Sequence, residues 1–175
     1  MGIKLFLNSD VTRILELTQR QVVHWTEKEL VIPFVESKGA GSKRKYTYTN
    51  LFEFSICKTL FDMGLGIHKV KLLLRDLRNE GQLTLWVEDY AKFLKKIMGN
   101  EEKNIENQHG ILLITFTDDG LLRQKIIPYN IAYLMGYKSY FHKILSNKGI
   151  IIINLSQIKT ALDNKIGSTI NSINM

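Results

Sequence analysis

Apolar positions recur at helical spacing in two short runs near the start of the chain. The first run follows Ser9 and Asp10, whose side chains suit a helix N-cap, and it predicts a helix over residues 10–16. The second predicts a helix over residues 19–30, ended by Pro33 because proline cannot continue the hydrogen-bond ladder. Two helices joined this closely form a helix-turn-helix candidate. The apolar positions are Val11, Ile14, Leu15 and Leu17 in the first run, and Val22, Trp25 and Leu30 in the second.

A hairpin-like wing is predicted after the second helix. Residues 34–47 place short apolar or aromatic flanks around a tip of glycine and serine. Such a cationic tip can settle on phosphate or enter a minor groove, although an isolated run of charge is usually only solvated. Its place after a helix-turn-helix favours the contact with nucleic acid. The cations of this segment are Lys38, Lys43, Arg44 and Lys45.

Two further helices are predicted to close the core under the first pair. Thr47 or Thr49 can cap the third helix, which Gly64 and Gly66 end, and the fourth helix stops near Gly81. The inward positions are Leu51, Phe52, Ile56, Thr59, Leu60 and Met63 in the third helix, and Ile67, Val70, Leu73, Leu74 and Leu77 in the fourth.

A two-heptad apolar seam is predicted between residues 83 and 98. Two interpretations are open: the seam pairs with its copy in a second chain, or it is an ordinary amphipathic helix packed on its own chain. A polar linker is expected to follow over residues 99–110. The candidate dimerisation residues are Leu83, Trp86, Tyr90, Phe93 and Ile97.

The rest of the chain predicts a small module in the order β-β-α-β-α. Asp118 and Asp119 are expected in a turn, and the last few residues, rich in asparagine and serine, are expected to fray. The strands are expected over residues 111–116, 121–127 and 149–153, and the helices over residues 129–145 and 155–166.

The predicted fold class is therefore mainly α with small β. It divides into an N-terminal winged helix-turn-helix domain (residues 1–81), a linking or dimerisation helix with its linker (82–110) and a small α+β C-terminal module (111–175), which could serve regulation or dimerisation. The chain has 175 residues, of which 45% are hydrophobic, as is normal for a globular protein.

Charge and the absence of export signals narrow the class of partner. A net charge of +7 and a pI near 9.4 weakly favour an anionic partner. No apolar run approaches the roughly 18 to 20 residues that cross a bilayer, and no cleavable signal opens the chain. We expect a cytoplasmic, nucleoid-associated protein without a membrane partner. The single cysteine, Cys57, cannot form an internal disulfide and is interpreted as a core residue.

The second predicted helix has the layout that reading duplex DNA requires. Base-edge readers must lie on one side of an element that fits the major groove, with phosphate contacts around it. Glutamine can read adenine, arginine can read guanine, and valine can touch a thymine methyl group. A merely solvated helix face is the alternative. The candidates in or near the first two turns are Thr18, Gln19, Arg20, Val23 and His24.

Three segments, in this order, resemble the MerR family of bacterial transcription regulators. Residues 18–33 are similar to its recognition helix and exit, residues 44–51 to its wing exit, and residues 63–70 to the joint between its third and fourth helices. The resemblance covers about residues 5–78. It implies DNA contacts by Arg20, His24, Trp25, Arg44 and Tyr46, with Trp25 at the DNA backbone and Arg44 and Tyr46 at the wing.

Three positions depart from the family pattern. Val23 stands where an arginine is common, Glu29 stands where a helix-ending glycine is usual, and His24 with Trp25 replaces a pair of tyrosines. The resemblance further implies a homodimer that binds two half-sites of a promoter and distorts the DNA between them, so that deformation energy contributes to specificity.

No enzyme, metal site or cofactor is predicted. The histidines show no ligand spacing, and no nucleophile with a base, phosphate loop or paired-carboxylate motif is present. Tyrosines between residues 129 and 140 could line a pocket for a small-molecule effector, although such rings more often fill a core.

Three functions are compatible with these observations. The first is a dimeric transcription regulator that binds a pseudo-palindromic promoter site on double-stranded DNA. The second is an excisionase-like or architectural protein that bends DNA for recombination. The third is a protein-interaction adaptor that works through its C-terminal module.

Overall fold

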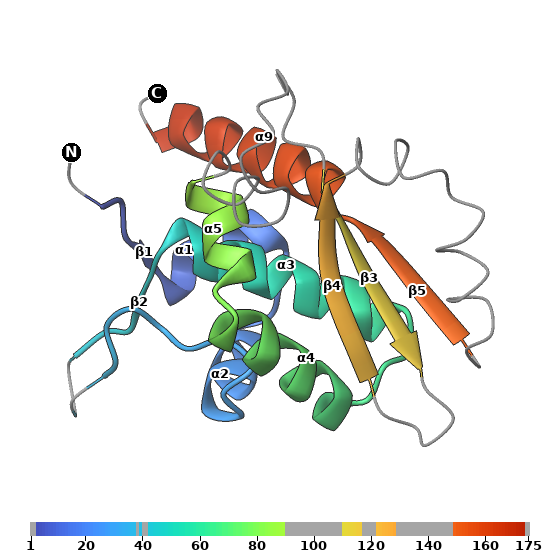
Figure 1. Cartoon of the computed structure of the whole chain (residues 1–175). Coiled ribbons are helices and arrows are strands. Elements are labelled where there is room, and N and C mark those ends of the chain that lie inside the picture. Colours follow the sequence, from blue (N-terminus) through green and yellow to red (C-terminus); the bar gives the residue numbers. More distant parts are fainter. Residues whose placement is uncertain are drawn as a thin grey trace. The chain divides into compact units, whose positions relative to one another are not determined.

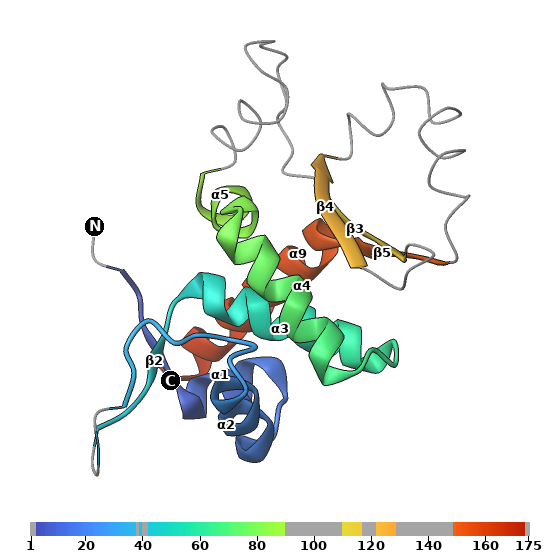
Figure 2. The same ribbon diagram turned by 60° about the horizontal axis from the view of Figure 1, so that its bottom comes forward.

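The computed structural model describes residues 3–37, 39, 42–89, 110–116, 122–128 and 149–173 (Figures 1 and 2). The fold is mainly helical with two small sheets, as the sequence predicts. Contacts group the chain into two compact units: residues 1–74 with 158–175, and residues 75–157. This grouping does not follow the predicted division at residues 81 and 110, because residues 75–81 group with the sheet and residues 158–175 group with the N-terminal unit.

Helices α1 (Asn8–Leu15) and α2 (Gln19–Glu27) form the predicted helix-turn-helix. The prediction that Ser9 or Asp10 caps α1 is wrong, because the helix begins at Asn8. Asp10 instead lies one turn inside the helix, where its Oδ2 accepts the N–H of Leu7 at 2.9 Å. A carboxylate at this third helical position satisfies a backbone donor before the helix, which is one half of a capping box.

The turn between α1 and α2 is closed by a residue in the left-handed conformation. Glu16 has φ 53°, and the N–H of Leu17 donates to the carbonyl of Thr12 at 3.1 Å. Lys58, in helix α3 (Tyr48–Asp62), donates its Nζ to the carbonyl of Leu15 at 3.0 Å. These contacts satisfy carbonyls that the end of α1 would otherwise leave without partners.

Helix α2 ends three residues before the predicted position, and Pro33 does not end it. Glu29 has φ 59°, a conformation that normally favours glycine, and the N–H of Leu30 reaches back to the carbonyl of Trp25 at 2.9 Å. Glu29 therefore takes the helix-ending position for which the sequence pattern led us to expect glycine. Its carboxylate is held by Lys71, with Nζ and Oε2 2.7 Å apart.

A short sheet forms the base of the predicted wing. Strand β1 (Phe6–Leu7) pairs antiparallel with strand β2 (Lys45–Tyr46), so that Phe6 lies opposite Tyr46. Val35 and Lys45 exchange two backbone hydrogen bonds of 3.0 and 3.1 Å. The hairpin is thus confirmed at its base. Strand β1 was not predicted, since two residues are too few to show alternation.

Helix α3 and helix α4 (Ile67–Asn79) supply much of the core. Thr47 caps α3, because its hydroxyl oxygen accepts the N–H of Asn50 at 3.3 Å. Met63 is 50% exposed, so its predicted core position is wrong: the helix ends at Asp62, and Gly64 with φ 83° turns the chain. The fully buried side chains are Leu51, Phe52, Phe54, Ile56, Cys57 and Leu60 in α3, and Val70, Leu73, Leu74 and Leu77 in α4.

The second unit contains a three-stranded antiparallel sheet in the order β4-β3-β5. Its elements match the strands predicted from the sequence within one residue at each end. Helix α5 packs on this sheet, since a Cβ at Gly110 would collide with the Trp86 indole. The bounds are α5 (Gln82–Glu88), β3 (Gly110–Phe116), β4 (Leu122–Pro128) and β5 (Gly149–Asn154).

Helix α9 (Leu155–Ile173) follows β5 directly. It is longer than predicted, and residues 167–173, part of the end expected to fray, are helical. The Oδ1 of Asn154 accepts the N–H of Gln157 at 3.0 Å, so an asparagine cap starts the helix. Leu155 and Leu162 are buried.

Several predictions lie outside the described residues. These are the linker before residue 110, the turn at Asp118 and Asp119, the helix over residues 129–145 with its tyrosines, and the tip residue Lys38. Of the helices that the structure describes, none combines the length and the apolar character needed to cross a membrane.

Candidate nucleic-acid interface

Helix α2 turns one polar face to solvent and one apolar face to the core. A capping box fixes its start: the Thr18 Oγ1 accepts the N–H of Gln21 at 3.1 Å, and the Gln21 Oε1 accepts the N–H of Thr18 at 2.8 Å. The side-chain oxygen of Gln21 therefore belongs to the capping box. On the outer face Gln19, Arg20 and His24 are exposed and Val23 is half-buried.

One acid on this face was not predicted. Glu27 is exposed and lies three residues after His24 and seven after Arg20, so helical periodicity places it on the same side. A carboxylate there can accept from the amino group of cytosine, and it repels phosphate. Its position in the last turn of α2 was the signal that could have identified it.

Trp25 is part of the core and does not face solvent. Its side chain is only 6% exposed, and its ring lies 5.1 Å from the ring of Phe61 and 6.1 Å from that of Phe54, measured between centroids. An enclosed side chain cannot touch a DNA backbone, so the structure corrects the contact that the family resemblance implied. Trp25 instead holds α2 against α3.

Tyr46 is also buried, with 0% exposure, and so cannot touch DNA from the wing. The Thr26 hydroxyl donates to the carbonyl of Val22 at 2.8 Å, which leaves its oxygen to accept the Tyr46 hydroxyl at 3.1 Å. Burial raises the pKa of Tyr46, so the phenol stays protonated and remains a donor. Tyr46 therefore fastens the wing strand to the recognition helix.

Removing the Tyr46 hydroxyl tests the contribution of its hydrogen bond with Thr26. We expect Tyr46→Phe to lower the free energy of unfolding by about 1 kcal/mol, the usual net contribution of one such hydrogen bond. Chemical denaturation of Tyr46→Phe, Thr26→Ala and the double variant measures the coupling. If the losses of the two single variants simply add, the two hydroxyls are not coupled and the assignment is wrong.

The wing cations differ in their exposure and in their ion pairing. Lys43 and Lys45 are exposed. Arg44 is largely covered, with 20% of its side chain exposed, and its Nε lies 3.1 Å from the Glu36 Oε1. Because Glu36 offsets the charge of Arg44, the lysines are the stronger candidates for phosphate contacts at the wing.

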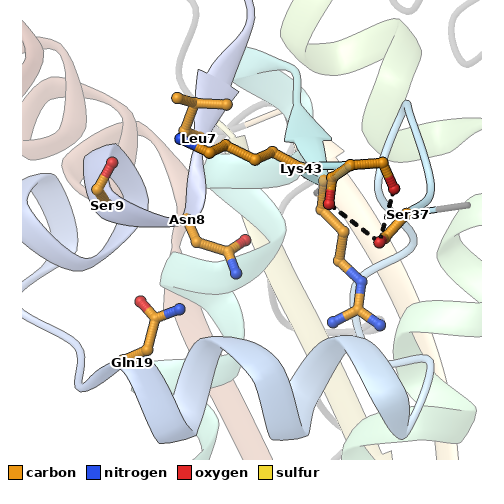
Figure 3. A pocket seen from close by; sticks show the side chains of 8 residues that line it. Leu7, Asn8, Ser9, Gln19, Ser37 and Lys43 are labelled. Atoms are coloured by element: carbon orange, nitrogen blue, oxygen red, sulfur yellow. Dashed lines mark hydrogen bonds between the residues drawn. The ribbon is translucent and has the colours of Figure 1, made fainter. Parts of the chain in front are cut away.

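A cleft of about 430 Å³ lies between the wing and the starts of α1 and α2 (Figure 3). Asn8 and Ser9 contribute from α1, Gln19 from α2, and Lys43 from the wing. Helix N-termini carry partial positive charge and backbone N–H groups that suit anions. The lining of the cleft therefore offers groups that suit an anion. Its full lining is Leu7, Asn8, Ser9, Gln19, Ser37, Ser42, Lys43 and Arg44.

The cleft unites residues that the sequence analysis treated separately. Gln19 belongs both to the cleft and to the outer face of α2, so base reading and phosphate binding would meet at this residue. Asn8, Ser9, Ser37 and Ser42 were not predicted. Small polar residues of this kind are common in loops and at helix ends, and only the fold brings them together.

The candidate dimerisation residues are only partly described. Leu83 and Trp86 are 0% exposed in the single chain, which matches the second of the two interpretations for these two side chains. Tyr90, Phe93 and Ile97 lie outside the described residues. Dimerisation therefore stays a prediction. Among the residues that the structure describes, no group of three or more histidine, cysteine, aspartate or glutamate side chains could hold a metal ion.

Comparison with known proteins points to one family. Residues 8–77 match the model of the MerR HTH family regulatory protein. Similar proteins include two uncharacterised HTH-type transcriptional regulators from strains of Mycobacterium tuberculosis and one from Mycobacterium bovis. Each is 33% identical over 70 residues, which are 39% of this chain and 31% of the relative. The chain thus matches about a third of the length of these curated relatives.

Proposed function

Because residues 8–77 are a helix-turn-helix domain of the MerR family, we propose that this chain binds duplex DNA at selected sequences and regulates transcription. The observation that carries the proposal is the exposed face of α2 beside a cleft lined by Lys43 and by two helix N-termini. Sequence-selective proteins combine base reading and phosphate binding in this way.

In this proposal α2 enters the major groove with its first two turns. Arg20 has the donor geometry to bind the O6 and N7 atoms of guanine, and Gln19 can pair with adenine. Val23 is placed to touch a thymine methyl group. Glu27 adds a preference for cytosine or, where phosphate comes near, a repulsion that restricts how the helix docks.

The cleft and the wing hold the sugar-phosphate backbone. Lys43 supplies the charge, and the N–H groups at the starts of α1 and α2 supply donors. These contacts carry no sequence information, but they fix the register of α2 on the duplex. The proposal assigns Trp25 and Tyr46 to the support of this surface, since both side chains are buried.

We further propose that the protein acts as a homodimer on a pseudo-palindromic site, as the family resemblance implies. Two-fold symmetry in the protein then matches two half-sites about one helical turn of DNA apart. Leu83 and Trp86 are not assigned to the dimer contact, because both are already buried in the single chain.

Selecting bound fragments from the native genome, followed by footprinting with permuted bending probes, tests the proposed function. Regulation predicts one pseudo-palindromic site that overlaps a promoter. Clustered direct repeats beside a recombination attachment site would replace this account with an excisionase-like one. Retention of no fragment at moderate salt would favour a protein-interaction adaptor.

The role of the wing lysine can be measured separately. We expect Lys43→Ala to weaken binding to selected and random duplexes alike, and to reduce the slope of log affinity against log salt by about one unit. Arg44→Ala should have a smaller effect, because Glu36 already offsets its charge. Fluorescence anisotropy over a series of salt concentrations gives both quantities.

A matched control is Lys69→Ala, which removes the same charge from an exposed position on α4. Its salt slope should equal that of the parent chain. Equal slopes for Lys43→Ala and the parent chain would remove Lys43 from the phosphate contacts.

A further inference from the structure

Helix α9 is bound to the winged helix-turn-helix unit by polar contacts from two separate places. The Tyr48 hydroxyl donates to the Asp163 Oδ1 at 2.6 Å, and the Lys165 Nζ lies 2.8 Å from the Glu16 Oε1. Lys159 supports the first contact, since its Nζ binds the Asp163 Oδ2 at 2.8 Å and lies 5.7 Å from the centre of the Tyr48 ring.

An apolar stripe accompanies these contacts. Leu162 is 2% exposed, and Ile158 and Ile166, one turn before and after it, are half-buried. Spacing of four residues puts the three side chains on one face of the helix. Burial of this face accompanies the polar contacts, and residues 158–173 group with the winged unit.

The two contact points adjoin the two parts of the proposed DNA-binding surface. Glu16 is the left-handed residue of the turn before α2, two residues ahead of the cap Thr18. Tyr48 is the first residue of α3, directly after the cap Thr47, where the wing rejoins the core. One helix thus holds the start of the recognition helix and the exit of the wing.

The docked helix does not cover the exposed face of α2. Figure 1 shows α9 on the side of α1 and α3 that is turned away from α2. A helix in this position supports the DNA-binding surface and does not block it. It also offsets the charge of Glu16, an acid close to α2 that would otherwise repel phosphate.

The ionic states of these groups favour the docked arrangement at neutral pH. Lys165 beside Glu16 holds the pKa of that carboxyl below its usual value, so the carboxylate is charged. Burial, with the Asp163 carboxylate, raises the pKa of the Tyr48 hydroxyl, which therefore remains a hydrogen-bond donor.

The first turn of α9 belongs to the other unit. The Ser156 Oγ accepts the N–H of Gly110 in β3 at 2.7 Å, and Asn154 at the end of β5 caps the helix. Residues 155–157 of α9 therefore group with the sheet, and residues 158–173 group with the winged unit.

We propose that α9 is a strut that keeps the recognition helix and the wing in the geometry for DNA binding, and that its release lowers DNA affinity. This inference rests on the proposed function, because it adds regulation to the same surface.

A charge exchange on α9 tests the strut in the full-length chain. Asp163→Lys combined with Lys165→Glu keeps the net charge but places like charges opposite Lys159 and Glu16. We expect hydrogen-exchange protection of residues 158–173 to fall about tenfold or more, together with protection of residues 15–18. The Kd for DNA should rise about tenfold, within the usual range of coupling between sites. The salt slope should not change, because no phosphate contact is removed.

Two further variants keep the test specific. Thr160→Lys with Asn164→Glu adds the same two charges to exposed positions of α9 and should leave both exchange and DNA affinity unchanged. Tyr48→Phe removes one docking contact and should shift both readouts in the same direction by a smaller factor. Unchanged exchange in the α3 core verifies that each variant is folded.

The possible results of these experiments test the docking contact, the role of α9 and the proposed function separately. Unchanged protection of α9 in the charge-exchange variant would overturn the docking contact itself. Loss of that protection with unchanged DNA affinity would overturn the proposal that α9 supports the DNA-binding geometry. If the parent chain binds no duplex at all, the proposed function fails, and exchange at residues 15–18 alone then decides whether α9 supports the turn.

Discussion

Trp25→Ala should lower the free energy of unfolding by about 3–5 kcal/mol, as truncation of a large buried ring commonly does. The side chain is 6% exposed and packs against the rings of Phe54 and Phe61. Its loss leaves a cavity between α2 and α3, and both the buried area and the aromatic contacts are lost. Urea denaturation followed by circular dichroism measures the change.

A conservative variant separates the two roles considered for Trp25. We expect Trp25→Phe to lower the unfolding free energy by a smaller amount and to keep the DNA affinity of the folded chain. A side chain that touched the DNA backbone would behave in the opposite way, with weakened DNA binding and little change in unfolding. That second pattern would reinstate the contact implied by the family resemblance.

Arg20→Ala should cost about 1–3 kcal/mol of binding free energy on the preferred DNA sequence, and much less on random duplex. Arg20 is exposed in the first turn of α2, where a fixed capping box sets the direction of the helix. Under the proposed function this variant loses a bidentate contact with guanine and keeps the phosphate contacts of the cleft. Binding curves on both duplexes at one salt concentration give the two losses.

Arg13→Ala is the matched control for this experiment. Arg13 lies on α1, is 47% exposed and pairs with Asp10 at 3.2 Å, so its removal takes the same charge from outside the outer face of α2. We expect small and equal losses on both duplexes. Equal losses for Arg20→Ala on the two duplexes would mean that Arg20 contacts phosphate and reads no base.

Local signals in the sequence were sufficient to predict most elements. Thr47 caps α3 as expected, and a hydroxyl followed three residues later by an amide forms a capping box there. The strands of the second unit were also predicted, since long β-branched runs are seldom found elsewhere. The fold class followed from these elements together with the family resemblance.

Features that depend on long-range packing were not predictable. Trp25 and Tyr46 have both an apolar ring and a polar atom, so the sequence allowed either a core position or a DNA contact. Only contacts with residues distant in sequence, Phe54 and Thr26 among them, place both rings in the core. The docking of α9 joins Glu16 to Lys165, and no local pattern signals such a distant pair.

The end of α2 at Glu29 likewise could not be predicted from local sequence signals. Pro33 was the visible stop signal, yet α2 ends earlier through a left-handed glutamate. Lys71 from α4 binds its carboxylate at 2.7 Å. Sequence rules give glycine for this conformation, because other residues adopt it at a cost that tertiary contacts must offset.

The central claim is that α2 reads bases while the cleft and wing bind phosphate, and one measurement tests it most directly. The affinity of the full-length chain is determined for a genome-selected duplex and for a scrambled duplex of the same length, over a series of salt concentrations. The account expects affinity to fall steeply with salt on both duplexes, and a preference for the selected one of about a thousandfold or more. Equal affinity for the two duplexes at every salt concentration, or binding that does not respond to salt, would contradict it.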